Sequence, residues 1–172
     1  GNMESEKCFR RWLWGIVAAA LLLRILCALP ALTQGGDLLL RPDSQTYLLP
    51  AKALLSDGAY SESPGSALPA TLRPPGYPLF LAGVFFLFGN SLTVPSLLGC
   101  LASALACYPA GLCGRFFAGR AGGLVAASFY ALNLTSVAAA PLILADSLLG
   151  LLCAWQLYFI LRAWRERRLV FF

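Results

Sequence analysis

Four long apolar runs, separated by polar segments, dominate the pattern of the chain. They cover residues 12–32, 92–114, 121–138 and 146–163. About 20 residues of helix span a hydrocarbon core of about 30 Å, because each residue rises by about 1.5 Å. The pattern therefore predicts an all-α integral membrane protein with about four transmembrane helices.

The first run follows basic residues, which is also the pattern of a secretory signal peptide. It is 21 residues long and lacks a small-x-small cleavage site before the polar segment. We therefore favour a helix that is retained in the membrane. Gly1 and Asn2 precede Met3 and look like a cloning remnant. Residues 1–11 form the short N-terminal segment before the first apolar run.

The polar segment 33–91 contains seven charged residues, which are interspersed with Gly, Ser and Pro. Within it, residues 44–56 have apolar side chains at helical spacing, follow Pro-Asp-Ser and end before Gly58, all of which indicate a helix. Residues 77–88 are apolar but only twelve long, which is too short to cross a bilayer. We expect two short amphipathic juxtamembrane helices, the first lying near the membrane surface and the second half-embedded in the membrane.

The charges indicate the orientation of the chain. Thirteen Lys and Arg against eight Asp and Glu give a net charge of +5. The basic residues gather near the ends of the apolar runs, and two of them bracket a Gly-rich break at residues 114–120. The three groups are Lys7, Arg10 and Arg11; Arg115 and Arg120; and Arg162, Arg165, Arg167 and Arg168.

Placing all three groups on the cytoplasmic side satisfies the positive-inside rule, and we prefer this to a nucleic-acid partner. The three later helices then occupy residues 92–168, and residues 169–172 form the C-terminal end. Segment 33–91 lies on the extracytoplasmic side of a plasma or bacterial inner membrane.

Composition narrows the class further. The chain is 59% apolar and 12% charged, with a mean hydropathy of +0.72, whereas soluble domains are about 45–50% apolar and about 25% charged. This excludes a disordered chain and most soluble folds. Six cysteines occur without a CxxC pair and without any histidine, so neither a zinc site nor a redox motif is indicated.

Two carboxylates are candidates for chemistry. Asp43 begins the first short helix and shares a face with Tyr47 four residues later, while Asp146 lies in an apolar stretch at the start of the last run. An acid within a membrane segment costs about 2.5–3.5 kcal/mol at the helix centre and less near an end. Either residue could instead be a helix cap. On one membrane face they could serve as a base with its electrostatic partner, or as ligands for Mg²⁺ or Mn²⁺.

Three basic residues are candidates for binding a phosphate. Arg73 lies in Arg-Pro-Pro-Gly-Tyr-Pro, where the prolines stiffen the backbone, and it could clamp a phosphate or extend to the lipid headgroups. Lys52 has the same two interpretations. Arg24 lies inside the first apolar run, where it needs a partner, either a lipid phosphate or an acid in the bundle.

The chain resembles the GT-C glycosyltransferases over residues 12–168. The resemblance is carried first by Asp43-x-x-x-Tyr47-x-x-x-Ala51-x-x-Leu54-x-x-x-Gly58-x-Tyr60 and by Arg73-Pro-Pro-Gly-Tyr77-Pro. The Gly-rich turn and the Leu-Ala-Asp146-Ser segment follow in the order that the family shows. The nearest branch contains the protein O-mannosyltransferases and the lipid A aminoarabinose transferase. Members of this family have more spans, so the chain resembles either their N-terminal module or a short, divergent member.

The resemblance implies an enzyme that transfers a sugar from a polyprenyl-phosphate donor to an acceptor hydroxyl at the outer membrane face, inverting the anomeric centre. It makes Asp43 the general base and Asp146 a second acid. Arg73 and Lys52 would face the donor phosphate, and Tyr47 and Tyr77 would shape the pocket.

The expected partners are membrane lipids, the lipid-linked sugar, and the remainder of the polypeptide or a second copy, with no nucleic acid. The alternative is a non-catalytic scaffold or lipid-phosphate-binding module of a larger complex. No cofactor is assigned beyond the divalent cation considered above.

Overall fold

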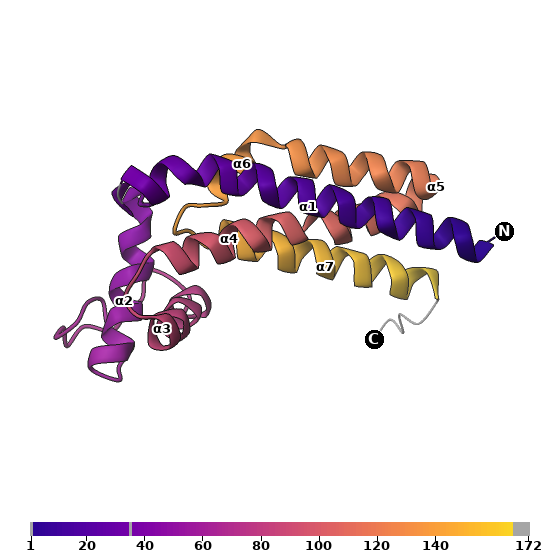
Figure 1. Ribbon diagram of the computed structural model, residues 1–172. Coiled ribbons are helices and arrows are strands. Elements are labelled where there is room, and N and C mark those ends of the chain that lie inside the picture. The colour runs from indigo at the N-terminus through magenta and orange to yellow at the C-terminus, as the bar shows by residue number, and fades with distance from the viewer. Residues whose placement is uncertain (1, 35, 167–172) are drawn as a thin grey trace. The chain divides into compact units, whose positions relative to one another are not determined.

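The computed structural model describes residues 2–34 and 36–166 (Figure 1). Over these residues the chain is helical, apart from loops and one bridge between Ser61 and Pro69, which confirms the all-α prediction. Three helical stretches are long and apolar enough to cross a membrane: Met3–Gln34, Thr93–Leu132 and Asp146–Arg165. The elements are α1 (Asn2–Gln34), η1 (Gly36–Leu39), η2 (Pro42–Ser44), α2 (Gln45–Ser56), α3 (Gly76–Phe88), α4 (Thr93–Leu105), α5 (Cys107–Leu132), α6 (Leu134–Ala139) and α7 (Asp146–Arg165).

The described chain divides into two units. Unit 1 takes its residues from 1–27, 100–140 and 146–172, and unit 2 from 28–99 and 141–145. Unit 1 contains most of α1 together with α5 and α7, whereas α2 and α3 belong to unit 2. Each unit is described by itself below.

A reversal inside α5 gives unit 1 its helical hairpin. Ala118 has φ −132° and ψ 27°, and Gly119 has φ +66° and ψ −160°, so the helical path is broken at these two residues. A positive φ favours glycine, which has no Cβ to clash. The break falls in the Gly-rich segment 114–120 where the sequence predicts a turn, and it divides the stretch Thr93–Leu132.

Small residues hold the two arms of this hairpin close together. A Cβ added to Gly114 would lie 2.5 Å from the Cβ of Ala126 and 2.6 Å from the carbonyl oxygen of Gly122. One added to Gly111 would meet the carbonyl oxygen of Gly123 at 3.2 Å. In a membrane the hydrophobic effect does not drive helices together, so helix association depends on close packing. Small residues allow the helix backbones to approach closely enough for such packing. We call these four glycines and Ala126 the glycine seam.

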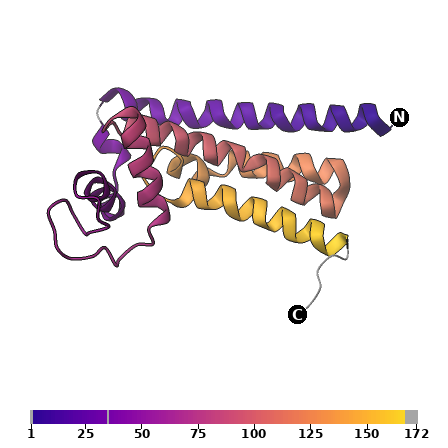
Figure 2. The same ribbon diagram turned by 90° about the horizontal axis from the view of Figure 1, so that it is seen from below.

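Helix α1 packs against the hairpin through its apolar face. Phe9 and Leu13 of α1 are buried in one cluster with Ala127 of α5. One turn further, Val17 and Ala20 pack with small residues of α4 and α5. Figure 2 shows α1 and α7 running along the same bundle as α5. Helix α7 packs directly against α5.

In unit 2, α2 packs against α3. Leu48 and Ala51 of α2 are buried, as are Leu81 and Phe85 of α3. The buried residues are three or four positions apart, which is the spacing of the buried face of an amphipathic helix. Each helix begins within one residue of its predicted start, and Gly58 follows the first with φ +67°. The two predicted short helices are therefore confirmed as helices.

Candidate functional site

Asp43 lies in a turn whose backbone is fixed from both sides. Pro42 begins η2, and the buried Ser44 accepts a hydrogen bond on Oγ from the backbone N–H of Arg41 at 2.9 Å. Thr46 Oγ1 donates to the carbonyl oxygen of Asp43 at 2.7 Å. Proline restricts φ at the first helical position. Asp43 thus leads into α2 with a defined backbone and a side chain that is 67% exposed.

Arg73 approaches this turn from the loop before α3. Its Nη2 lies 3.1 Å from Oδ2 of Asp43, and its Nε donates to Oγ1 of Thr46 at 3.0 Å. The guanidinium carbon also lies 4.9 Å from the centroid of the Tyr47 ring, which is cation–π distance. An exposed ion pair alone is worth about 0–1 kcal/mol, but here three contacts converge on one side chain. Arg73 is thereby oriented, with 29% of its side chain exposed.

Tyr60 holds the backbone of Arg73. Its hydroxyl donates to the carbonyl oxygen of Arg73 at 2.7 Å. Burial raises the pKa of Tyr60 above its ordinary value, so the hydroxyl remains a donor at neutral pH. Tyr60 belongs to the motif that carries the resemblance, yet sequence reasoning gives it no role. Only its fold-back onto a residue thirteen positions later shows one.

Two further aromatic rings extend the site. The ring of Tyr77 meets that of Tyr47 edge-on with centroids 5.2 Å apart, and it stacks on Phe80 at 5.7 Å. Aromatic pairs at such distances favour a fixed mutual geometry. Four predicted site residues therefore meet in unit 2: Asp43, Tyr47, Arg73 and Tyr77. With Thr46 and Tyr60 we call them the Asp43 cluster.

A cavity of about 160 Å³ adjoins the cluster. Its polar side contains Thr46 and Arg73, and Glu62 faces it from the loop that follows α2. Leu49 and Leu72 make part of its wall apolar. A mixed lining with an arginine at its edge suits a molecule with an anionic group and an apolar part.

The loop between α2 and Arg73 is tied back on itself. Asp57 Oδ2 accepts a hydrogen bond from the backbone N–H of Gly65 at 2.6 Å. This bond, with a smaller contribution from Ser56, holds the pKa of Asp57 below its ordinary value. The closed loop brings Tyr60 and Arg73 back to the start of α2.

Lys52 and Asp146 lie outside the cluster. Lys52 is half-buried on α2 and takes no part in the contacts described above. Asp146 is exposed as the first residue of α7 and belongs to unit 1. The segment that precedes it belongs to unit 2, where the N–H of Ile143 donates to the carbonyl oxygen of Leu39 at 3.0 Å. No group of three metal-ligating His, Cys, Asp or Glu side chains occurs over residues 2–34 and 36–166.

Arg24 has no exposed surface and lies within unit 1. Its Nε donates to Oγ of Ser103 at 2.8 Å, and its Nη1 donates to the carbonyl oxygens of Ala20 and Ala131 at 3.1 and 3.2 Å. Nη2 lies 3.5 Å from the carbonyl oxygen of Tyr130. Over the described residues, the partners of Arg24 are a hydroxyl and backbone carbonyls, and not the bundle acid that was one of the two expected alternatives. Two of these carbonyls lie in the last turn of α5, and that of Tyr130 also accepts a hydrogen bond from the backbone N–H of Asn133 at 3.3 Å. A lipid phosphate as a partner stays a prediction.

The comparisons with known proteins agree with the helical membrane architecture. The family model described as dolichyl-phosphate-mannose-protein mannosyltransferase matches residues 72–172, which is more than half of the chain. The match includes Arg73, Tyr77 and Asp146 and begins after Asp43. No curated protein and no solved structure shows significant similarity to the chain.

Proposed function

Because the chain belongs to the dolichyl-phosphate-mannose-protein mannosyltransferase family, we propose that it transfers a sugar from a polyprenyl-phosphate donor to an acceptor hydroxyl. The reaction takes place at the extracytoplasmic face of the membrane and inverts the anomeric centre. The observation that carries the proposal is the Asp43 cluster, in which a carboxylate, an arginine and two aromatic rings from α2, α3 and the connecting loop meet.

Asp43 acts as the general base in this scheme. The acceptor hydroxyl donates a hydrogen bond to its carboxylate, and the hydroxyl oxygen attacks the anomeric carbon of the sugar. As the new carbon–oxygen bond forms, the bond to the phosphate oxygen breaks, Asp43 takes the proton, and the polyprenyl phosphate leaves. Attack on the side opposite the phosphate inverts the anomeric centre. The 67% exposure of Asp43 supports access by an acceptor.

Arg73 stabilises the phosphate that leaves. A guanidinium has five N–H donors, and the contacts of Arg73 to Asp43 and Thr46 use one on Nη2 and one on Nε. The remaining donors can bind the phosphate as charge develops on it. Lys52 is proposed to assist at the donor phosphate, and Asp146 to supply the second acid. Tyr47 and Tyr77 shape the pocket.

The test is sugar transfer by the chain reconstituted in liposomes. The probes are radiolabelled polyprenyl-phosphate mannose and a synthetic peptide rich in Ser and Thr. Asp43→Asn keeps the shape of the side chain but removes the base, so transfer should fall about 10²–10⁴-fold. Asp37→Asn is the matched control, because Asp37 is an exposed acid of η1 in the same unit and outside the cluster.

Transfer that survives Asp43→Asn would remove the base role from Asp43. Donor binding without transfer by the unaltered chain, in the presence or absence of Mg²⁺ and Mn²⁺, would favour the lipid-phosphate-binding module. A product with the anomeric configuration of the donor would overturn the inverting mechanism. Asp146→Asn tests the second acid in the same assay, where a full rate would remove it from the scheme.

A further inference from the structure

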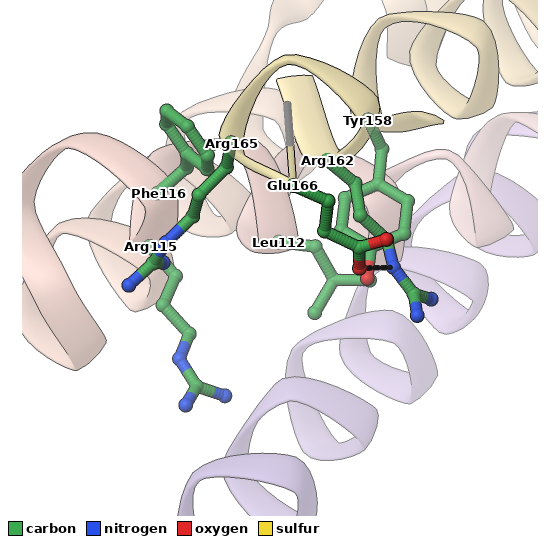
Figure 3. A pocket seen from close by; sticks show the side chains of 7 residues that line it. All are labelled: Leu112, Arg115, Phe116, Tyr158, Arg162, Arg165 and Glu166. Atoms are coloured by element: carbon green, nitrogen blue, oxygen red, sulfur yellow. Dashed lines mark hydrogen bonds and ion pairs between the residues drawn. The ribbon is translucent and has the colours of Figure 1, made fainter. Parts of the chain in front are cut away.

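Unit 1 has a second cavity that the proposed reaction does not use. It measures about 560 Å³ and lies between α5 and α7 (Figure 3). Its lining combines arginines with two aromatic rings and a leucine. The residues are Leu112, Arg115, Phe116, Tyr158, Arg162, Arg165 and Glu166. We call this the arginine cavity.

The three arginines are not equally neutralised. Arg115 forms a bidentate ion pair with Glu6 of α1, in which Nη1 donates to Oε1 at 2.6 Å and Nη2 donates to Oε2 at 2.8 Å. Arg162 donates from Nε to Oε1 of Glu166 at 2.9 Å. Arg165 instead lies over the ring of Phe116, with 5.6 Å between its guanidinium carbon and the ring centroid. Over the part of the chain that the structure describes, no carboxylate oxygen lies within 4.0 Å of Arg165. The cavity therefore retains positive charge.

The position of the cavity along α7 places it near the membrane surface. α7 has 20 residues, and the two arginines it contributes lie in its last turn. A helix of this length covers about 30 Å, so a span that begins near Asp146 ends at these arginines. Trp164 and Phe117 are 62% and 73% exposed beside them, as expected of aromatic side chains at a lipid headgroup layer.

We propose that the arginine cavity binds the phosphodiester headgroup of an anionic phospholipid. Arg165, which has no carboxylate partner among the described residues, contacts the phosphate, and the apolar rim formed by Leu112 and Phe116 lies against the start of the acyl chains. A soluble anion would find the same charges, but it would gain nothing from the apolar rim. An ordinary surface-anchoring arginine needs no cavity, whereas here three guanidinium groups from two helices line one space.

Native mass spectrometry of the full chain tests this site. The protein is released from detergent micelles that contain equimolar phosphatidylglycerol and phosphatidylcholine. One phosphatidylglycerol should remain bound in preference to phosphatidylcholine. Arg165→Gln should weaken its apparent affinity at least tenfold, because a hydrogen bond to a charged group is lost along with the charge. The apparent affinity of Arg165→Lys for phosphatidylglycerol should lie between those of the unaltered chain and Arg165→Gln, since lysine keeps the charge but loses the planar donor pair.

Arg11→Gln is the matched control. Arg11 is an exposed arginine on α1, in the same unit and close in sequence to Glu6, but it does not line the cavity. It should reduce affinity by no more than about fivefold, the nonspecific attraction of one basic residue at an anionic surface. Equal losses for Arg11→Gln and Arg165→Gln would overturn the site, as would equal retention of the two lipids. Displacement by glycerophosphoglycerol, the headgroup without acyl chains, at the lipid's own concentration would assign the cavity to a soluble phosphate instead.

Discussion

Arg24 in unit 1 and Arg73 in unit 2 use the same side chain in opposite ways. Arg24 is fully buried, and its contacts are one serine hydroxyl and three backbone carbonyls. Arg73 is partly exposed, and its contacts are a carboxylate, a threonine hydroxyl and the face of a tyrosine ring. The first arginine binds carbonyls at a helix end, whereas the second pairs with an exposed carboxylate and keeps donors that these contacts do not use.

The difference teaches how to separate structural from functional charges in a membrane chain. A charge buried in an apolar bundle is expensive unless protein atoms satisfy it, and once they do, little remains for a ligand. A charge at the edge of a cavity is held by fewer contacts and stays available. We therefore expect changes at Arg24 to affect stability and changes around Arg73 to affect activity.

Arg24→Met should have the largest effect. Methionine fills a similar volume but removes the donor to Oγ of Ser103 and to the carbonyl oxygen of Ala131. Each unsatisfied buried group costs about 1–3 kcal/mol, so the free energy of unfolding should fall by about 3 kcal/mol or more. Thermal unfolding in detergent measures this, with Arg11→Met as the exposed control on the same helix. A stable Arg24→Met variant that no longer binds the lipid-linked donor would restore the substrate-binding role expected from the sequence.

Arg73→Gln should lower transfer about tenfold to hundredfold while leaving thermal unfolding nearly unchanged. Hydrogen bonds to charged groups are worth about 1.5–3 kcal/mol, and the exposed ion pair with Asp43 contributes little to stability. Arg73→Lys should give an intermediate rate, because a compact ammonium keeps the charge but loses the planar, fixed arrangement of donors that the guanidinium offers to Asp43, Thr46 and a phosphate. A loss of stability as large as that of Arg24→Met would abolish the contrast between the two arginines.

Tyr60→Phe should have a smaller effect. The variant loses one hydrogen bond to the carbonyl oxygen of Arg73, worth about 1 kcal/mol. Because Tyr60 acts through the position of Arg73, kcat should fall severalfold with the pH profile unchanged. A shift of the pH profile without loss of kcat would instead indicate that the Tyr60 hydroxyl itself takes part in proton transfer.

Acid should loosen the loop closed by Asp57, with the smallest effect of the four. The pKa of Asp57 is lowered in the folded protein, so its contribution is complete above the unfolded value of 3.8 and is lost as the pH falls through the folded value. Hydrogen exchange at the Gly65 amide, corrected for its intrinsic pH dependence, should show less protection below about pH 3.8 than at pH 6. Asp57→Asn should remove this pH dependence, and an unchanged profile in that variant would place its cause elsewhere.

Local spacing was enough to predict part of the site. Asp43 and Tyr47 share a helical face, and Arg73 and Tyr77 share a proline-stiffened segment, so each pair could be anticipated. That the two pairs meet depends on the loop between them, which is closed by the Asp57–Gly65 and Tyr60–Arg73 hydrogen bonds. Such long-range bonds have no periodic signature in a sequence.

The partners of Arg24 were hidden for a different reason. The sequence showed that a charge in the first apolar run needs a partner, and it suggested a lipid phosphate or an acidic side chain. The actual acceptors are mostly backbone carbonyls, made available because α5 ends at Leu132 and the chain turns extended at Asn133. Main-chain groups are the same at every position, so a sequence does not mark which of them are free.

The glycine seam also limits how unit 1 can move. Where backbone meets backbone, the two arms of the hairpin fit in one register, because a shift along the seam would drive the Cβ of Ala126 into the facing chain. The two arms should therefore move as one rigid body during any conformational change. Bending is left to the break at Asn133, beside the carbonyls that Arg24 holds.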